Sequence, residues 1–106
     1  MRFNLKKIVH KHGDIALMEA KNGAEAVEAI KNQEFDLILM DITMPVMDGL
    51  TAITYIMGIK PDQDIVIVSS EGQEQTIAEA LSIGAKDFIL KPFSEKQIMN
   101  LLNKFF

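Results

Sequence analysis

Three short runs of hydrophobic residues stand out along the chain, and none of them alternates with polar residues as a half-exposed strand would. An uninterrupted apolar run predicts a strand that is buried on both faces, which is typical of a parallel sheet covered by helices on both sides. A fourth run is weaker, as expected of a strand nearer the edge of such a sheet. The three strong runs span residues 36–40, 65–68 and 87–90, and the weaker run spans residues 15–18.

Between these runs the spacing of apolar residues changes to about 3.6, which predicts helices. The last helix has the clearest start, because Ser94 and Gln97 form a capping-box pattern. Gly84 stands where the preceding helix needs a left-handed residue to end, and Asp48 is predicted as the N-cap of a helix over residues 49–57. The other predicted helices cover residues 1–11, 24–31 and a stretch around Ile77 and Leu81, and the last one carries an apolar stripe of Ile98, Leu101, Leu102 and Phe105.

The elements follow one another as a helix and then four repeats of strand and helix, which makes four strands and five helices. This alternation predicts an α/β fold with a doubly wound parallel sheet and right-handed crossovers. At 106 residues the chain is long enough to bury one core, and it is predicted to form one domain over residues 1–106. We expect no linker and no attached output domain.

Composition and charge exclude several classes of protein. Hydrophobic residues make up 48% and charged residues 25%, which is typical of a folded globular domain. The net charge is −4 and the longest basic cluster is Lys6-Lys7, so nucleic acid is not an expected partner. No apolar run approaches the roughly 18 residues that span a bilayer, so no membrane partner is expected. The chain has no cysteine, which suits a reducing compartment, and we expect the cytoplasm.

Polar residues with complementary chemistry follow the three strong runs directly. They are Asp41, the pair Ser69-Ser70, and Lys91. Because the carboxyl ends of parallel strands meet at one edge of a sheet, we expect Asp41, Ser69 and Lys91 to converge there. A carboxylate nucleophile, a hydroxyl that donates a hydrogen bond and an ammonium group that neutralises charge suit phosphoryl transfer to Asp41.

Each of these residues also has a purely structural interpretation. An aspartate after a strand is most often a turn or cap residue, and a lysine alone is most often a solvated surface residue. Ser69 or Ser70 could cap the next helix. Phe88 is predicted to lie in the core when judged on burial propensity alone. For Asp41 the composition of segment 43–49 favours the functional interpretation.

Two segments resemble the signatures of bacterial response-regulator receiver domains. Residues 40–49, with the sequence MDITMPVMDG, are similar to the phosphoacceptor segment of that family. Lys91-Pro92-Phe93, preceded by residues 84–88 (GAKDF), is similar to the second signature. With Ser69 between the two segments, the resemblance covers every residue from Met1 to Phe106, and it is closest to single-domain regulators of the chemotaxis type.

The resemblance implies a flavodoxin-like receiver fold with strand order 2-1-3-4-5 and a cis bond between Lys91 and Pro92. It also implies a sensor histidine kinase as phosphoryl donor and a downstream target protein as partner. The implied roles are phosphorylated aspartate for Asp41, switch hydroxyl for Ser69, phosphate-binding lysine for Lys91, switch aromatic for Phe88, and Mg²⁺ binding for Asp41 and the backbone carbonyl of Thr43.

The chain departs from the family pattern at its beginning. Receiver domains open with an apolar strand that ends in two adjacent acidic residues, and Met1 aligns a few residues beyond that pair. With the strand and the pair absent, we expect weak Mg²⁺ binding and impaired phosphorylation. Asp14 and Glu71 do not occupy matching positions. The absent strand would lie between strands 15–18 and 36–40, so we expect a new strand pairing or a homodimer formed by strand exchange.

Three interpretations of function remain open at this point. The first is a phosphoacceptor in two-component signalling, in which phosphorylation of Asp41 shifts a surface around the Ile77 helix and the Phe88 strand. Such a protein is not an enzyme beyond self-catalysed phosphoryl transfer and dephosphorylation. The second is a dimerising or protein-interaction module of receiver fold that is not phosphorylated. In the third, Met1 is an internal methionine of a longer coding sequence. The sequence does not distinguish a role in chemotaxis from a role in another phosphorelay.

Overall fold

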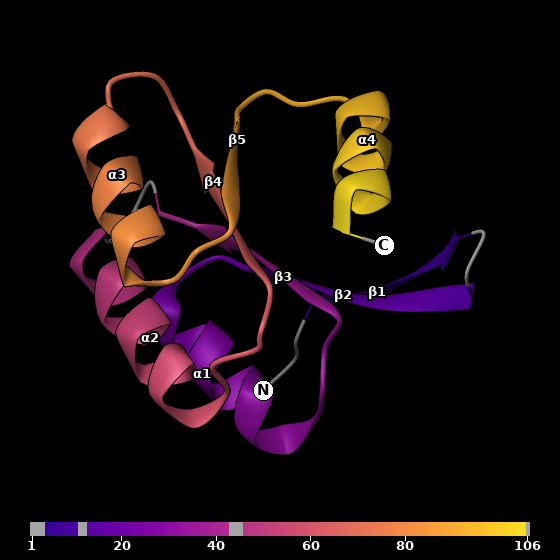
Figure 1. The fold of residues 1–106 in the computed structure, drawn as a ribbon, viewed down its shortest axis with the longest axis horizontal. Helices are drawn as coiled ribbons and strands as arrows, with labels where there is room; N and C mark the ends of the chain where they lie inside the picture. The colour runs from indigo at the N-terminus through magenta and orange to yellow at the C-terminus, as the bar shows by residue number, and fades with distance from the viewer. Residues whose placement is uncertain (1–3, 11–12, 43–45, 106) are drawn as a thin grey trace.

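The computed structural model describes the backbone of residues 4–10, 13–42 and 46–105, and the side chains of residues 16–42 and 49–105. Strands and helices alternate from the second strand onward, as Figure 1 shows. The strands are β1 (Asn4–His10), β2 (Gly13–Ala20), β3 (Leu37–Asp41), β4 (Ile65–Ser69) and β5 (Asp87–Leu90). The helices are α1 (Gly23–Asn32), α2 (Val46–Ile59), α3 (Glu74–Ile83) and α4 (Glu95–Phe105).

The described strands form one sheet in the order β1-β2-β3-β4-β5. Strands β2 to β5 are parallel, and β1 is antiparallel to β2. Because each parallel strand is added on the same side of the previous one, right-handed crossovers put α1, α2 and α3 on the same face of the sheet. Helix α4 follows the last strand and covers the opposite face (Figure 1). The predicted four-stranded parallel sheet is therefore confirmed.

Side chains alternate along each strand, so every strand contributes to two separate hydrophobic clusters. The three-helix face is the larger cluster, and the α4 face is the smaller one. On the three-helix face the buried strand residues include Met18, Ala20, Ile38, Met40, Ile65 and Ile67, which pack against helix residues such as Ala26, Ile53 and Ile77. On the α4 face the buried residues are Leu17, Leu37, Leu39, Val66, Val68, Ile89, Leu101 and Leu102.

The helix predicted over residues 1–11 is wrong, because residues 4–10 form strand β1. β1 and β2 pair as a hairpin with a register from Asn4 opposite Glu19 to His10 opposite Gly13. Without β1, one edge of β2 would present a row of unpaired backbone N–H and C=O groups, and the hairpin satisfies them. The described part of the chain thus contains five strands and four helices instead of four strands and five helices.

The strand order taken from the family resemblance also differs from the structure. Strand β2 pairs directly with β3, from Leu17 opposite Leu37 to Ala20 opposite Met40. No other strand lies between them. The order reverses nowhere along the described strands, so the second winding of the predicted doubly wound sheet is not seen in these ranges. The pairing of β2 with β3 is thus formed within one chain.

Several local predictions are confirmed. The Ser94 Oγ atom accepts a hydrogen bond from the Gln97 amide at 3.2 Å, and Gln97 Oε1 accepts one from the Ser94 amide at 2.8 Å, which completes the capping box before α4. Gly84 ends α3 with a φ of 154°, and a Cβ atom there would lie 2.6 Å from the side chain of Met57. The bond between Lys91 and Pro92 is cis.

Three other local predictions are wrong. Helix α2 begins at Val46, so Asp48 lies inside the helix and is not its N-cap. The N-cap of α3 is Gln73, so neither Ser69 nor Ser70 caps that helix. Phe88 is 41% exposed and does not lie in the core, because β5 is an edge strand with a neighbour on only one side.

Candidate functional site

The carboxyl ends of the parallel strands bring Asp41 and Lys91 together, although the two residues are 50 positions apart in the sequence. Lys91 Nζ donates a hydrogen bond to Asp41 Oδ2, and the two groups form an ion pair. Both side chains remain partly exposed to solvent. An exposed ion pair stabilises a fold by about 1 kcal/mol or less, so its main effect here is to hold an ammonium group beside a carboxylate.

Backbone hydrogen bonds position these residues. Asp41 lies opposite Val68 in the β3–β4 register, and the amide of Ile42 donates to the Val68 carbonyl at 3.0 Å. The amide of Lys91 donates to the carbonyl of Ser69 at 2.8 Å. The last residues of β3, β4 and β5 are thus linked across the sheet, as the sequence predicts for residues that follow parallel strands.

Ser69 is completely buried at the end of β4, on the strand between Asp41 and Lys91. Its Oγ atom has no hydrogen-bond partner among the described residues. A buried hydroxyl without a partner is costly, and such a group in a native protein requires an explanation. Ser69 does not line the small cavity that opens beside Asp41 and Lys91. The structure therefore brings Asp41 and Lys91 into contact and places Ser69 on the adjoining strand end.

Gln73 was not singled out from the sequence, and its side chain connects two loops at this edge. Gln73 Oε1 accepts a hydrogen bond from the Ser70 amide at 2.9 Å, and Gln73 Nε2 donates to the Ile42 carbonyl at 3.3 Å. These bonds join the segment after β4 to the segment after β3. A glutamine three residues beyond Ser70 carries no signal in a single sequence that would reveal this contact.

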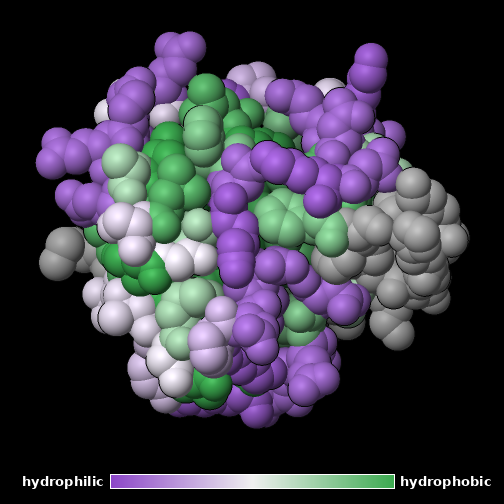
Figure 2. Space-filling view, in the orientation of Figure 1, coloured by the Kyte–Doolittle hydropathy of each residue, from purple (hydrophilic) through white to green (hydrophobic). Residues whose placement is uncertain are grey.

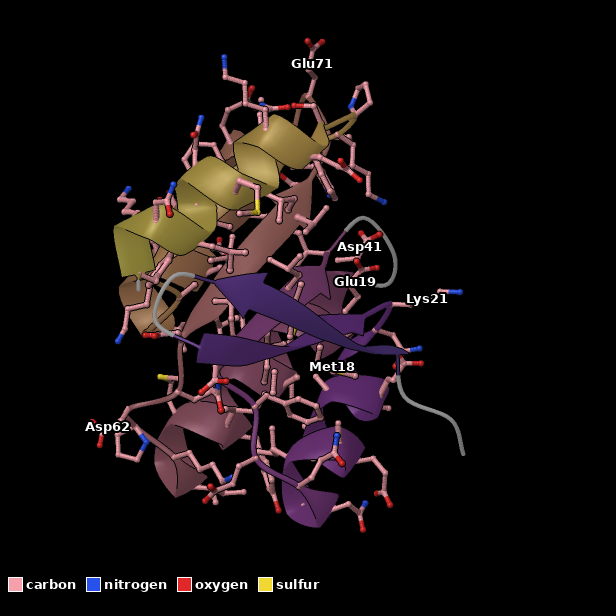
Figure 3. All side chains as sticks on the ribbon, turned by 90° about the vertical axis from the view of Figure 1, so that its right-hand side faces the viewer. Met18, Glu19, Lys21, Asp41, Asp62 and Glu71 are labelled. Atoms are coloured by element: carbon pink, nitrogen blue, oxygen red, sulfur yellow. The ribbon has the colours of Figure 1, made fainter. Side chains whose placement is uncertain are left out.

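A small cavity of about 210 Å³ opens beside the Asp41–Lys91 pair. Figure 3 shows Glu19 and Asp41 next to each other, with Lys21 at the end of β2. Glu19 was missed by sequence reasoning, although it directly follows the weak apolar run 15–18 just as Asp41 follows a strong one. The cavity is lined by Glu19, Ala20, Lys21, Leu39, Asp41, Val68, Lys91 and Phe93.

The remaining predicted site residues lie elsewhere or outside the described residues. Thr43 belongs to segment 43–45, and the side chain of Asp14 is likewise outside the described set. Glu71 lies far from Asp41 in Figure 3, so it does not contribute an acidic group to this site. Phe88 lies on β5 and does not line the cavity.

The carboxylate groups at the cavity are ligands of the kind that Mg²⁺ prefers. This cation prefers oxygen ligands and is commonly held by one or two carboxylates together with phosphate oxygens and water. Glu19 and Asp41 provide two carboxylates at the cavity. Among the residues that the structure describes, no group of three or more histidine, cysteine, aspartate or glutamate side chains is arranged to hold a metal ion.

Asp64 and Asp87, two acidic groups with shifted pKa values, lie at the opposite, amino ends of the strands. Burial raises the pKa of Asp64, and the nearby charge of Lys86 only partly offsets this. Burial also acts to raise the pKa of Asp87, but hydrogen bonds from Lys104 and from the Phe88 amide, together with the charge of Lys104, outweigh burial and lower it. Neither group lies at the cavity beside Asp41.

Comparisons with known proteins agree on one family. The family model described as response regulator receiver domain matches residues 1–103. The chemotaxis protein CheY of Thermotoga maritima is 47% identical over 104 residues, which are 98% of this chain and 87% of that protein. The chemotaxis protein CheY of Bacillus subtilis is 44% identical over the same share of both chains.

A solved structure gives the same result for the fold. The receiver domain of NtrX from Brucella abortus superposes with a TM-score of 0.70 at 28% identity, over 78% of this chain and 71% of that domain. In a longer NtrX structure, the similarity covers 81% of this chain and only 19% of that protein. The similarity to NtrX is therefore confined to one domain of a larger molecule. No helix in the described ranges is long and apolar enough to cross a membrane.

Proposed function

The chain belongs to the response regulator receiver domain family, and from this premise we propose that it accepts a phosphoryl group on Asp41 from the phosphohistidine of a sensor kinase. The contact between Lys91 Nζ and Asp41 Oδ2 carries the proposal. It holds a nucleophilic carboxylate beside a cation at an edge that is open to solvent. A carboxylate needs no general base to act as a nucleophile, so positioning and charge neutralisation supply the catalysis.

In the proposed step an oxygen of Asp41 forms a bond to phosphorus while the P–N bond to the donor histidine breaks. The electron pair of that bond leaves on the imidazole nitrogen. Lys91 remains beside the acceptor oxygen and neutralises charge on the phosphoryl group. Attack of water on phosphorus later returns Asp41 to its carboxylate form and releases inorganic phosphate. These are the two reactions that we assign to this domain, and both take place on its own side chain.

The hydroxyl of Ser69 supports the proposal, because it can donate a hydrogen bond to a nearby phosphoryl oxygen. The buried Ser69 hydroxyl has no partner among the described residues, and it would gain one when a phosphoryl group is attached to Asp41. Mg²⁺, when bound by Asp41 and its neighbours, would add positive charge at the phosphoryl oxygens. Impaired phosphorylation remains part of the proposal, because the described residues contain no group of three or more histidine, cysteine, aspartate or glutamate side chains that could hold the metal ion.

Phosphorylation would act on a partner protein through the surface around α3 and β5. Large hydrophobic side chains are exposed in these elements, namely Leu81, Phe88 and Leu90. Figure 2 shows hydrophobic surface over α3 and β5 in the orientation of Figure 1. A phosphoryl group on Asp41 would favour one arrangement of this surface over another, as ligands do in two-state proteins. We place this protein in the cytoplasm, as its sequence predicts.

The proposal is tested with acetyl phosphate and Mg²⁺, followed by intact-mass measurement. The wild-type chain should gain the mass of one phosphoryl group, and Asp41→Asn should gain none. Asp62→Asn is a matched control, because this aspartate is exposed and lies far from Asp41 (Figure 3). Lys91→Gln should slow labelling by roughly 10²-fold, which is the typical effect of removing one charge-stabilising group from an enzyme active site. Equal labelling of wild type and Asp41→Asn would overturn the proposal.

A second candidate function is dimerisation through the sheet. It is favoured by the position of β1, which is an edge strand of the described sheet and seven residues long. An uncovered edge strand can pair with another chain, so a sheet-joined or strand-exchanged homodimer would form there. Native mass spectrometry at micromolar concentration is the test, and a spectrum that contains only monomer would exclude this function.

A further inference from the structure

Glu19 takes no part in the proposed phosphoryl transfer steps, yet it lies beside Asp41 at the same cavity. Strand β2 pairs directly with β3, and Glu19 lies opposite Leu39 in that register. Asp41 is two residues further along β3. From the usual strand spacing and rise per residue, the Cα atoms of Glu19 and Asp41 are about 8 Å apart.

The two side chains also point to the same side of the sheet. Leu17 and Leu39 are both buried in the cluster of the α4 face. Side chains alternate along a strand, so Glu19, two residues after Leu17, and Asp41, two residues after Leu39, share that face. Both line the cavity of about 210 Å³, and Figure 3 shows them adjacent. The glutamate is longer than the aspartate by one methylene group, which lets it extend toward the end of β3.

We propose that Glu19 is a Mg²⁺ ligand and supplies the second carboxylate of the site in this chain. The inference rests on the proposed function, because it assigns the cation to the phosphoacceptor site. Mg²⁺ is held in phosphate sites by one or two carboxylates, and Glu19 with Asp41 makes two. Glu19 reaches this place only because β2 lies next to β3. It was not matched to any site residue on the basis of the family resemblance.

The charge of the cavity predicts how strongly the ion binds. Glu19 and Asp41 share the cavity with Lys21 and Lys91, and Lys91 already contacts Asp41. The four groups sum to no net charge, so Mg²⁺ must compete with two ammonium groups for the carboxylates. We therefore expect saturable but weak binding in the absence of a phosphoryl group.

The test is a Mg²⁺ titration of the unphosphorylated full chain, followed by amide chemical shifts at constant ionic strength. In the wild type, the amides at the ends of β2 and β3 should shift with a saturable dependence on Mg²⁺. Glu19→Gln keeps the size of the side chain and removes its charge. Loss of an outer-shell partner alone weakens metal binding by about 10–100-fold, so this variant should weaken it by at least about tenfold.

Two further variants make the titration specific. Glu34→Gln removes the same charge from an exposed residue at the opposite end of the sheet, so its Mg²⁺ affinity should equal that of the wild type. Glu19→Asp retains the charge on a shorter side chain, so its Mg²⁺ affinity should lie between those of the wild type and Glu19→Gln. Thermal unfolding without Mg²⁺ checks that each variant folds. Mg²⁺ should raise the midpoint of the wild type more than that of Glu19→Gln, because the ion binds the folded state.

The outcomes separate this inference from the proposed function. An unchanged Mg²⁺ affinity in Glu19→Gln, or the absence of saturable binding in the wild type, would overturn the role of Glu19. Labelling of Asp41 by acetyl phosphate is measured independently. If labelling fails while Glu19→Gln weakens Mg²⁺ binding, the proposed function is wrong and the cation site stands. If labelling succeeds and the affinity is unchanged, only the role of Glu19 is wrong.

Discussion

The two faces of the sheet are covered to different extents. Helices α1, α2 and α3 cover one face and pack against one another, with α2 in contact with both neighbours. On the other face α4 is the single described helix, and a groove of about 450 Å³ remains beside it. The groove is lined by Leu17, Glu19, Leu39, Phe93, Ser94, Glu95, Ile98 and Met99.

This difference places most of the buried apolar packing on one side of the sheet and the carboxylate of Asp41 on the other. The strands supply buried apolar side chains to the three-helix face along nearly their whole length. Toward the α4 face the same strands end in Glu19 and Asp41, which are only partly buried. In the proposed reaction a phosphoryl donor has to reach Asp41 from solvent, which the less covered face allows. Three predictions test this division.

The largest expected effect is on the three-helix face. Ile53 is completely buried there, and Ile53→Ala should lower the free energy of unfolding by about 3 kcal/mol, because it removes buried methylene groups and leaves a cavity. Urea unfolding followed by far-ultraviolet circular dichroism measures the loss.

The matched change on the α4 face is Ile98→Ala. Ile98 is partly buried and lines the groove, so less surface is returned to water and the loss should be about 1 kcal/mol. Equal losses for the two isoleucine variants would show that the two faces contribute similarly to stability, against the division proposed here.

The intermediate effect concerns Ser69. Its side chain alternates with those of Ile65 and Ile67, so it belongs to the three-helix side at the very end of β4. Ser69→Ala removes a buried hydroxyl that has no partner in the described part of the chain. It should raise the free energy of unfolding by about 1 kcal/mol and lower phosphorylation by acetyl phosphate.

Chemical denaturation and intact-mass labelling measure these two effects on the same Ser69→Ala sample. Ser82→Ala is the control, because that exposed hydroxyl donates to the Glu79 carbonyl at 2.9 Å and does not line the cavity beside Asp41. A destabilised Ser69→Ala would mean that the hydroxyl has a stabilising partner in the folded protein.

The smallest expected effect concerns how α4 is attached to the sheet. Lys104 Nζ lies 2.6 Å from Asp87 Oδ2, and this contact helps to lower the pKa of Asp87 below its ordinary value of 3.8. A lowered carboxyl pKa stabilises the folded state at pH values above 3.8, and the stabilisation is lost as the pH falls through the pKa of the folded state. Because the pair is exposed, we expect less than about 1 kcal/mol.

Urea unfolding of wild type and Asp87→Asn between pH 2 and pH 7 tests this point. The difference in stability should be largest near pH 7 and should vanish at the acid end of the series. For Asp64→Asn the stability difference should depend on pH in the opposite direction. Its raised pKa means that the ionised group is less favourable in the folded state, so wild type should lose stability relative to Asp64→Asn as the pH rises through the pKa of folded Asp64. An unchanged difference for Asp87→Asn across the series would exclude the contribution of its ionised carboxylate.

Much of the local structure can be predicted from the sequence alone, because it depends on residues close together in the chain. The capping box of Ser94 and Gln97 and the left-handed end of α3 at Gly84 each follow from a few neighbouring residues. The meeting of Asp41 and Lys91 was also predictable, because both directly follow apolar runs and parallel strands end at a common edge. The exposure of Phe88 could not be predicted, because it depends on β5 being the last described strand of the sheet.

The strand pairing is what the sequence by itself left undetermined. Residues 1–11 fit a helical stripe, yet residues 4–10 form a strand, because the open edge of β2 offers backbone hydrogen bonds that a helix would leave unsatisfied. The same pairing places β2 against β3 and brings Glu19 beside Asp41. The sequence by itself determined that Asp41 and Lys91 meet at the carboxyl ends of their strands. Only the tertiary structure decided which acid lies beside them, because that depends on contacts between strands far apart along the chain.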